Sequence, residues 1–392
     1  MFDVPATLSD NLTKGCLPFL LAGGQGSRLH ELTAHECKPA VHFADAGRIV
    51  DFVMSGVHRA GFDEMFVATQ YKPNTLTRHM ETAWAGGFAK GLHLRDGAKI
   101  ANQQGYRGTA DAVMANLAEV DRINPKEVLI LAADHVYDMD FTAMLEAHRA
   151  SGAMATLAAT PVPRMEATGF GVLAINGANR CVEFAEKPKD PAAMPGRSDM
   201  ALASMGIYVF DWEWLRDAIM EAFKREGTSH DFGHDIMPMA LAQDTLNVYA
   251  LPDSEDGTPG YWRDVGTLDA YRLALLDFEN GSPIRLPKAP DQAYSKPADM
   301  TSASSTIEES VVLPGASVGS NCRLSKTIVG AGTEIPSGLV VGEDHDEDAR
   351  WFRCTDGGTT LVTSEMLARR ADQRTLMHPM SSQRPHSHIV SQ

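Results

Sequence analysis

The chain has 392 residues, of which 44% are hydrophobic and 22% charged, an ordinary globular composition that is enough for one large domain and a smaller one. The net charge of −16 argues against a general basic face for nucleic acid, so any phosphate must be bound by a few placed Lys and Arg side chains. No apolar run approaches the ~18 residues of a membrane span, and the N-terminus lacks the basic start of a signal peptide. The five cysteines form no CxxC pair, so we expect reduced thiols in a cytoplasmic protein and no zinc site.

From residue 17 to about residue 180 the sequence alternates between strand and helix patterns. Apolar residues from Ile49 to Ala60 repeat at helical spacing, and Gly61 is the expected end of that helix. The run EVLILAAD (127–134) is apolar almost throughout, as strands inside parallel sheets are. Strand and helix in alternation favour an α/β fold with a doubly wound, mostly parallel sheet. The expected strands are 16–22, 64–70, 127–134, 155–162, 171–175, 181–186, 202–210 and 247–251, and the expected helices are 49–60, 113–120 and 141–151.

Pro18 is an awkward residue in the first expected strand, which this architecture places centrally. Proline has no N–H group to donate to a neighbouring strand. We therefore expect Pro18 at the start of the strand, with pairing from Phe19 onward.

The character of the sequence changes near residue 280. Residues 281–305 are rich in Pro, Ser and Ala and are predicted to be a linker after a domain of residues 1–280. Beyond the linker, apolar residues recur every six positions with one interval of five, which predicts a hexapeptide β-helix over 306–370 of about two coils. So small a piece must pack on the α/β domain or on another subunit. The polar residues 371–392 are expected to form a disordered tail. The repeating residues are Val312, Val318, Leu324, Val329, Ile335 and Val341.

The first expected strand leads into LLAGGQGSRL (20–29), whose glycines leave the backbone bare, as phosphate-binding loops do. A dinucleotide-binding loop needs glycine where Leu29 stands, and a P-loop needs Gly-Lys-Ser/Thr, which this sequence lacks. The pattern GGxGxR, followed about ten residues later by Lys38 and Pro39, fits a nucleotidyltransferase loop. In such a loop Arg28 and Lys38 would bind a triphosphate and stabilise the leaving pyrophosphate. The alternative is a plain glycine turn between a strand and a helix.

Two aspartates are candidates for a metal site. Asp134 ends the apolar strand 127–134, at the carboxyl edge where α/β sheets bind ligands. Asp264 lies far along the chain, in YWRDVGT. Two carboxylates brought together can hold Mg²⁺, which prefers oxygen ligands and phosphate. The alternatives are a helix N-cap for Asp134 and an unremarkable loop acid for Asp264.

Segments spread over nearly the whole chain resemble, in the same order, motifs of the bacterial ADP-glucose pyrophosphorylases (glucose-1-phosphate adenylyltransferases), within the nucleoside-diphosphate-sugar pyrophosphorylases. The resemblance implies a Rossmann-like catalytic domain followed by a left-handed β-helix, usually in a homotetramer. It also implies transfer of the adenylyl group of ATP to glucose 1-phosphate, giving ADP-glucose and pyrophosphate for glycogen or a related α-glucan. The segments are LLAGGQGSRL (20–29), KPAVHF (38–43), VATQY (67–71), YRGTADAV (106–113), LAADHVYDMD (131–140), PRMEATGFGV (163–172), EFAEKP (183–188), ALASMGIYVF (201–210), HDFGHDIMP (230–238), YWRDVGTLDAY (261–271) and IPSGLVVGED (335–344).

The resemblance also assigns residues. Two alternatives stay open, since Lys187 with Pro188 could be a solvated turn and Tyr106 a half-buried aromatic. His30, His35 and His42 suit no metal-ligand set, so we expect them to be solvated or packed. The implied catalytic residues are Arg28, Lys38, Asp134 and Asp264, with Mg²⁺ on Asp134 and Asp264; the nucleotide-binding residues are Gly23, Gly24, Gly26, Gln70, Gly108 and Thr109; and the sugar-phosphate residues are Tyr106, Gly171, Glu186, Lys187 and Ser204.

The sequence of this chain differs from the family at positions that family members use for regulation. Members usually read LTxxRAKPAV, whereas this chain reads LTAHECKPAV, so basic residues used for anionic sugar-phosphate activators are replaced. The acid at Glu36 would repel such an activator. Gly105 stands where the family usually has Trp, in a region tied to activation, and the β-helix looks truncated. We therefore predict weak or altered activation and altered assembly.

Other hypotheses remain open. Gln25 and Ala133 replace a common arginine and a common glycine, which keeps a non-catalytic regulatory or partner subunit in view. The same chemistry could act on UTP, GTP or dTTP, or on glucosamine 1-phosphate. A structural trimeric β-helix protein is disfavoured because the repeat is short, and a dehydrogenase is disfavoured by Leu29.

Overall fold

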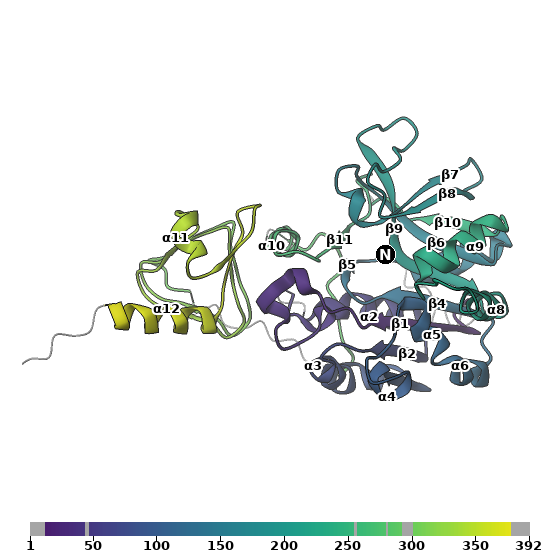
Figure 1. Ribbon diagram of the computed structural model, residues 1–392, viewed down its shortest axis with the longest axis horizontal. Helices are drawn as coiled ribbons and strands as arrows, with labels where there is room; N and C mark the ends of the chain where they lie inside the picture. Colours follow the sequence, from purple (N-terminus) through teal and green to yellow (C-terminus); the bar gives the residue numbers. More distant parts are fainter. Residues whose placement is uncertain (1–11, 44–46, 255–256, 280, 292–300, 378–392) are drawn as a thin grey trace, which may run out of the picture. The chain divides into compact units, whose positions relative to one another are not determined.

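The computed structural model describes residues 12–43, 47–254, 257–279, 281–291 and 301–377 (Figure 1). The chain divides into two compact units, Met1–Lys296 and Pro297–Gln392, which we call the first unit and the second unit. The described parts of the expected linker, 281–291 and 301–305, contain no helix and no strand element, and 292–300 lies outside the described residues. The boundaries expected for the domains and the linker remain predictions.

The first unit is built on a sheet in the order β10-β6-β9-β4-β1-β2-β3, with β7 joined to β9 and β8 to β7. Four of the six neighbouring pairs along this path are parallel: β10–β6, β4–β1, β1–β2 and β2–β3. The predicted α/β fold with a mostly parallel sheet is confirmed. The strands are β1 (Cys16–Ala22), β2 (Glu64–Thr69), β3 (Gly91–Asp96), β4 (Glu127–Ala132), β6 (Ala155–Pro163), β7 (Gly171–Ile175), β8 (Cys181–Glu186), β9 (Met200–Asp211) and β10 (Leu246–Ala250), with β5 (His135–Tyr137) and β11 (Trp262–Asp264) paired separately.

Strand order determines where a ligand can bind. The chain leaves β1 for β2 on one side and reaches β4 on the other side, so β1 and β4 flank a reversal of strand order. Such a reversal opens a crevice at the carboxyl ends of the strands. The expectation for Pro18 is corrected: it lies inside β1, and the register with β4 runs from Cys16 and places Pro18 opposite Leu129. Only the register with β2 begins at Phe19, so a proline without an N–H group is tolerated where the β2 side of β1 is still unpaired.

Helices cover both faces of the sheet and close two apolar cores. Leu129 and Leu131 of β4 pack in the core with α2 and α7, whereas Val128 and Ile130 pack in the core with α5, α8 and α9. Burial on both faces explains why β4 is a continuous apolar run. None of the described helices combines the length and apolar character needed to cross a membrane. The helices are α2 (Ile49–Ala60), α3 (Asn74–His79), α4 (Gly97–Ile100), α5 (Thr109–Met114), α6 (Leu117–Ile123), α7 (Phe141–Ser151), α8 (Trp212–Ala222), α9 (Met237–Ala242) and α10 (Leu268–Asp277), with the short turns η1 (Ser27–Thr33), η2 (Lys38–Ala40), η4 (Met80–Trp84), η5 (Ala85–Gly87), η6 (Ala167–Gly169) and η7 (Phe232–Ile236).

Two elements of the first unit also differ from the sequence expectations. The helix expected over 113–120 is divided into α5 and α6. The fully buried Asn116 lies at the break and donates from Nδ2 to the carbonyl oxygen of Ala112 at 2.8 Å. The apolar spacing continues across this break, so the pattern did not reveal it. β3 was not predicted, because it is short and its alternation is limited to Leu92 and Leu94, with all six residues only half-buried.

The second unit is the predicted β-helix. Its parallel strands stack as β12-β15-β18, β13-β16-β20 and β14-β17. Thr306 pairs with Arg323 and Ser317 with Glu334, so a coil takes 17 residues, which accounts for the single five-residue interval. The predicted residues form its core, with Val312 packed against the edge. The elements are β12 (Thr306–Glu308), β13 (Val311–Val312), β14 (Ser317–Val318), β15 (Arg323–Ser325), β16 (Thr327–Val329), β17 (Glu334–Ile335), β18 (Val340–Val341), α11 (His345–Ala349), β19 (Arg353–Cys354) and β20 (Thr360–Val362).

The tail requires a correction. Helix α12 (Ser364–Met377) extends through residues 371–377, which the sequence analysis assigned to a disordered tail. The helix has a fixed start, because Thr363 accepts a hydrogen bond at Oγ1 from the backbone N of Met366 at 3.4 Å and Met366 packs in the β-helix core. Once started, it can continue with exposed polar residues. Residues 378–392 lie outside the described residues.

Candidate active site

The glycine loop follows β1 at the carboxyl edge of the sheet. Its backbone is left-handed at Gly26, where φ is 68°. A Cβ atom there would lie 2.6 Å from the Cβ of Lys38, so the close approach of two segments requires glycine. Thr33 fixes the loop by donating from Oγ1 to the carbonyl oxygen of Gly26 at 3.0 Å. The predicted phosphate loop therefore lies against the predicted catalytic lysine.

Lys38 joins the two predicted aspartates. Its side-chain Nζ donates to Oδ2 of Asp134 at 3.1 Å and to Oδ1 of Asp264 at 2.8 Å, and the residue is 3% exposed. Burial would lower the pKa of Lys38, but the two carboxylates outweigh burial and raise it above its ordinary value. Burial would likewise raise the pKa of Asp134, yet the charge of Lys38 and its hydrogen bond hold it well below its ordinary range. Both Lys38 and Asp134 are therefore ionised at neutral pH.

Asp264 reaches this cluster through a short antiparallel ribbon. β11 pairs with β5, which begins directly after Asp134, and the register places Asp264 opposite His135 (Figure 1). Nη2 of Arg28 lies 3.9 Å from Oδ2 of Asp264, while the Arg28 side chain is 66% exposed. An exposed guanidinium beside a carboxylate remains accessible to an entering anion. The four residues predicted to be catalytic thus form one cluster.

His135 belongs to the cluster although the sequence analysis did not single it out. Its Nε2 lies 3.7 Å from carboxylate oxygens of both Asp134 and Asp264. Its ring packs edge-on against Trp262, with centroids 5.0 Å apart, and its buried Nδ1 has no hydrogen-bond partner within the described part of the chain. The available signal was its place directly after Asp134 in LAADHVY.

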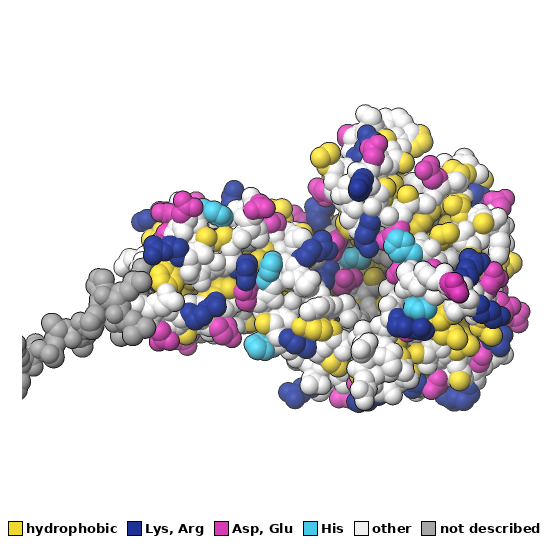
Figure 2. Space-filling model, viewed as in Figure 1, with side chains coloured by type: hydrophobic (Ala, Val, Ile, Leu, Met, Phe, Trp, Pro, Cys, Tyr) yellow, Lys and Arg dark blue, Asp and Glu magenta, His cyan; other side chains and the backbone are white. Residues whose placement is uncertain are grey.

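A cavity of about 410 Å³ adjoins the cluster. Figure 2 shows Lys, Arg, Asp, Glu and His side chains around a hollow in the first unit, in the region where Figure 1 draws β5 and β11. The predicted residues in its wall are Gly23, Gly24, Gln70, Tyr106, Gly108, Thr109, Asp134 and Glu186. The predicted residues outside its wall are Gly26, Arg28, Lys38, Asp264, Gly171, Lys187 and Ser204.

Gln70 shapes the cavity by holding the backbone of Tyr106. Its Oε1 accepts from the backbone N of Tyr106 at 2.9 Å, and its Nε2 donates to the carbonyl oxygen of the same residue at 3.1 Å. The Tyr106 hydroxyl donates to the carbonyl oxygen of Arg95 at 3.0 Å. Tyr106 is 8% exposed, so it is buried rather than half-buried, and it contributes to the cavity wall.

The opposite wall combines two motifs far apart in the chain. A Cβ on Gly108 would lie 2.3 Å from the carbonyl oxygen of His230, so the two loops touch through bare backbone. The Thr109 hydroxyl donates to Oδ2 of Asp231 at 2.8 Å and accepts from the backbone N of Phe232 at 3.0 Å. Thr109 therefore links the YRGT and HDFG segments.

The remaining predicted residues lie around β7, β8 and β9. Gly171 pairs with Glu186 across β7 and β8. Nζ of Lys187 lies 3.0 Å from Oε1 of Glu186, and the Lys187 side chain is 63% exposed. Ser204 on β9 is 8% exposed and accepts at Oγ from the backbone N of Gly206 at 3.2 Å.

Comparison with known proteins identifies the family of the chain that carries this site. Residues 17–281 match a family described as nucleotidyl transferase, and residues 296–362 match one described as GlmU-like, C-terminal hexapeptide. A glucose-1-phosphate adenylyltransferase of Jannaschia sp. (strain CCS1) is 38% identical over 410 residues, which cover 92% of this chain and 98% of the relative. This chain belongs to the glucose-1-phosphate adenylyltransferase family.

Other members give the same result. The glucose-1-phosphate adenylyltransferase of Cereibacter sphaeroides (strain ATCC 17025 / ATH 2.4.3) is 38% identical over 92% of this chain and 97% of the relative. That of Mannheimia succiniciproducens (strain MBEL55E) is 39% identical over 91% of this chain and 94% of the relative. The resemblance inferred from the motifs, and the succession of an α/β domain and a left-handed β-helix, are confirmed.

In this glucose-1-phosphate adenylyltransferase fold, the sequence motifs identified the segments that form the site, but they did not identify every side chain that lines it. Tyr208, Asp231 and Phe232 line the cavity, yet none was singled out. These residues lie in the matching segments ALASMGIYVF and HDFGHDIMP, but the sequence analysis assigned them no role.

Cavity size does not identify the site. A larger cavity, of about 600 Å³, opens at the amino ends of β1 and β2, where Lys14, Cys16 and Glu64 contribute to its wall. None of the predicted site residues lines it. The charges clustered at the carboxyl edge are therefore the better guide.

Proposed function

We propose that this chain transfers the adenylyl group of ATP to glucose 1-phosphate, giving ADP-glucose and pyrophosphate for glycogen or related α-glucan synthesis. The observation that carries the proposal is the Lys38–Asp134–Asp264 cluster beside a cavity walled by the glycine loop. The names of the relatives point to the substrates. The cluster offers the charges that joining two phosphate compounds requires.

The reaction depends on positioning and charge neutralisation. The phosphate oxygen of glucose 1-phosphate is ionised near neutral pH and attacks the α-phosphorus of ATP in line, while the bond to the bridging oxygen breaks and pyrophosphate leaves. The glycine loop can bring backbone N–H groups to the phosphate oxygens. Arg28 is exposed and can neutralise the departing pyrophosphate, and Lys38 stays charged beside the reacting groups.

We propose Mg²⁺ as the cofactor, held by Asp134 and Asp264. Two carboxylates brought together fit a cation that prefers oxygen ligands and leaves other positions to phosphate and water. Bound there, Mg²⁺ would polarise the phosphate oxygens. Both carboxylates contact Nζ of Lys38, so the lysine sets their orientation. Among the described residues no group of three or more His, Cys, Asp and Glu side chains is placed to hold a metal, which agrees with a site that phosphate and water would complete.

We assign the glucose 1-phosphate end of the site to β7, β8 and β9. Glu186 lines the cavity and can accept hydrogen bonds from sugar hydroxyls. Lys187 is paired with Glu186 but largely exposed, so it can turn toward a phosphate group. Gln70, Gly108 and Thr109, on the other walls, are assigned to the nucleotide.

Activation by sugar phosphates should be weak or altered. Oε2 of Glu36 lies 3.0 Å from Nη1 of Arg48, so an acid of the chain already neutralises this cation. A free anion would have to compete with it. Titration of fructose 1,6-bisphosphate against the initial rate is the test, and a stimulation of about tenfold or more would contradict the proposal.

We further propose that the chain forms a homo-oligomer in the cytoplasm, and that its short β-helix alters the tetrameric assembly that the resemblance implies. The five cysteines are unpaired, as expected in a reducing compartment. Light scattering across protein concentrations tests the assembly: a stable tetramer at low concentration would contradict the idea that assembly is altered.

The function is tested by pyrophosphate release with Mg²⁺ and glucose 1-phosphate across ATP, UTP, GTP and dTTP. We expect turnover with ATP, and a loss of about a hundredfold to a thousandfold in Asp134→Asn. Asp138→Asn is the matched control, since Asp138 lies in the same segment but pairs with Arg59. Binding of ATP without turnover would favour a partner subunit, and preferred turnover of another nucleotide would reassign the substrate.

A further inference from the structure

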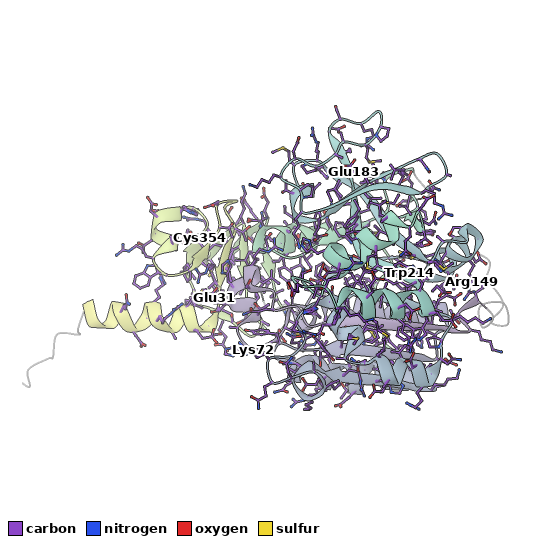
Figure 3. The ribbon with its side chains drawn as sticks, turned by 45° about the vertical axis from the view of Figure 1, so that its right-hand side comes forward. Glu31, Lys72, Arg149, Glu183, Trp214 and Cys354 are labelled. Atoms are coloured by element: carbon purple, nitrogen blue, oxygen red, sulfur yellow. The ribbon has the colours of Figure 1, made fainter. Side chains whose placement is uncertain are left out.

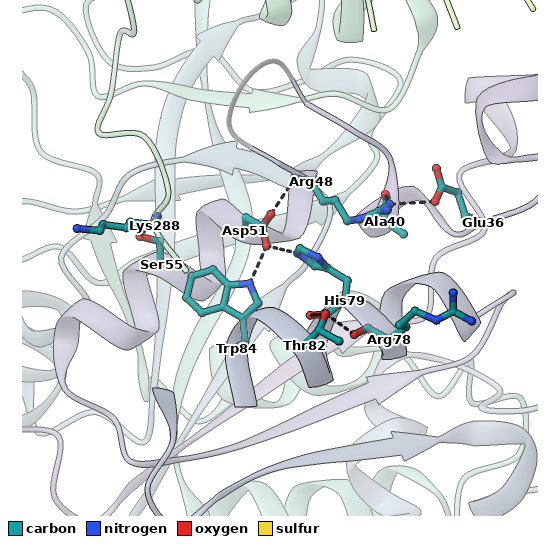
Figure 4. A network of polar contacts seen from close by, with 10 residues as sticks. All are labelled: Glu36, Ala40, Arg48, Asp51, Ser55, Arg78, His79, Thr82, Trp84 and Lys288. Atoms are coloured by element: carbon teal, nitrogen blue, oxygen red, sulfur yellow. Dashed lines mark hydrogen bonds and ion pairs between the residues drawn. The ribbon is translucent and has the colours of Figure 1, made fainter. Parts of the chain in front are cut away.

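Arg48 lies just before α2 and contacts the segment that carries Lys38 (Figure 4). Its Nη1 donates to Oε2 of Glu36 at 3.0 Å and also to the carbonyl oxygen of Ala40. One guanidinium nitrogen therefore holds positions on both sides of Lys38. The side chains of Arg48 and Glu36 are 17% and 21% exposed, so the pair is largely removed from water.

The backbone of Arg48 is held as firmly as its side chain. Its N–H donates to Oδ2 of Asp51 at 2.8 Å. Asp51 is fully buried, accepts at Oδ1 from Nε1 of Trp84 at 2.7 Å, and lies 2.6 Å from Nε2 of His79 (Figure 4). None of these four residues lines the cavity, and the proposed reaction uses none of them. A network so completely satisfied fixes the backbone from which the Arg48 side chain extends.

Lys38 is the residue for which this support matters. Its long, flexible side chain must meet two carboxylates, at 2.8 and 3.1 Å. Its backbone lies in a single turn, η2, closed by the N–H of Val41 on the carbonyl oxygen of Lys38 at 3.1 Å. So short a turn takes its position from the contacts at its ends. These are the contacts that Arg48 makes and the hydrogen bond from the backbone N–H of Ile49 to the carbonyl oxygen of Val41, at 3.0 Å.

We propose that Arg48 is a positioning residue for Lys38, acting through the carbonyl oxygen of Ala40 with Glu36 as its counter-ion. The proposal rests on the adenylyl transfer proposed above. A displaced η2 changes the distances from Lys38 to both carboxylates, whereas the cavity walls outside η2, which contributes Pro39, stay in place. The loss therefore falls on kcat and leaves KM nearly unchanged.

The first test compares Arg48→Lys with Glu36→Gln. Arg48→Lys keeps the charge but loses the length and planar geometry of the guanidinium. It should lower kcat by about tenfold to a hundredfold. Glu36→Gln leaves the contact from Arg48 to Ala40 and should lower kcat by less. Neither variant should change KM for ATP or glucose 1-phosphate by more than about threefold.

The matched control is an ion pair of similar burial away from the site. Arg149, labelled in Figure 3, donates from Nε and Nη2 to the carboxylate of Glu127 at 2.9 and 3.1 Å. Neither residue lines the 410 Å³ cavity. Arg149→Lys should lower the thermal midpoint about as much as Arg48→Lys does, yet leave kcat within about twofold of the unchanged chain. Equal kcat in the two arginine variants would overturn the proposal.

Charge reversal separates positioning from simple stability. Glu36→Arg combined with Arg48→Glu rebuilds an ion pair, but a carboxylate at position 48 cannot donate to the carbonyl oxygen of Ala40. We expect the thermal midpoint to recover relative to Arg48→Glu alone while kcat does not. Recovery of kcat together with the midpoint would also overturn the proposal.

A second readout needs no turnover. Lys38 is buried, so an amine-reactive reagent followed by peptide mass spectrometry should label it slowly in the unchanged chain. Arg48→Lys should increase this labelling several-fold, and Arg149→Lys should not. Equal labelling in both variants would overturn the positioning role, even if the unchanged chain formed no ADP-glucose and the proposed function failed.

Discussion

The two ends of the proposed site depend on different kinds of interaction. At the phosphate end, Lys38 is buried between Asp134 and Asp264, and the charges shift the pKa values of Lys38 and Asp134 in opposite directions. At the sugar end, Glu186 contacts a largely exposed lysine and Ser204 contacts backbone. Charge neutralisation requires ions that are fixed before the substrate arrives, whereas sugar recognition can exchange one polar partner for another.

The largest effect should come from breaking the phosphate end. Lys38→Gln removes the charge that both aspartates share, so the rate of ADP-glucose formation should fall by about a thousandfold. The unfolding free energy should also fall, by about 3–5 kcal/mol, because two partly buried carboxylates lose their partner. Rates and denaturant unfolding measure the two losses. Lys90→Gln, at an exposed lysine paired with Asp63, is the control and should change neither quantity appreciably.

A smaller effect of another kind should follow at the sugar end. Glu186→Gln retains one acceptor oxygen but loses the charge, so KM for glucose 1-phosphate should rise about tenfold and kcat should change less. Initial rates at varied glucose 1-phosphate measure this split. Glu183→Gln, on the same strand but exposed (Figure 3), should behave as the unchanged chain. A loss confined to kcat would remove the distinction between the two ends.

The smallest effect concerns pH. The pKa of Asp134 is lowered from its ordinary value of 3.8, so its contribution to stability is complete above that value and lost as pH falls through the folded pKa. The pKa of Lys38 is raised from 10.5, so its contribution is complete below that value and lost as pH rises through the folded pKa. The difference in unfolding free energy between the unchanged chain and Asp134→Asn should therefore stay constant from about pH 5 to pH 9. A difference that varies inside this window would show that the cluster titrates.

The sequence predicted best what is local and periodic. The hexapeptide spacing from Val318 to Val341 identified the β-helix core, because each inward side chain is separated from the next by a fixed number of residues. Asp134 was recognised because it ends an apolar strand, and the carboxyl edge of such strands binds ligands. The family motifs, which occur in the same order along the chain, then identified the family.

The contacts that complete the site were not predictable in this way. Asp264 is 226 residues from Lys38, and only the pairing of β11 with β5 brings the two together. Gln70 was expected near the nucleotide, but its amide is engaged with the backbone of Tyr106, which no local pattern indicates. His135 was overlooked because its neighbour Asp134 carried the motif. Such contacts depend on the tertiary fold, which brings together residues that are far apart in the sequence.

The β5–β11 ribbon has a consequence for how the protein is made. A ribosome releases the glycine loop, Lys38 and Asp134 long before it releases Asp264. Until β11 emerges and pairs with β5, a nascent chain has one of the two carboxylates that hold the lysine. The catalytic charges are therefore balanced late in synthesis, after most of the sheet strands have left the ribosome. A chain cut short before Trp262 would carry the phosphate loop and most of the sheet and still be chemically incomplete.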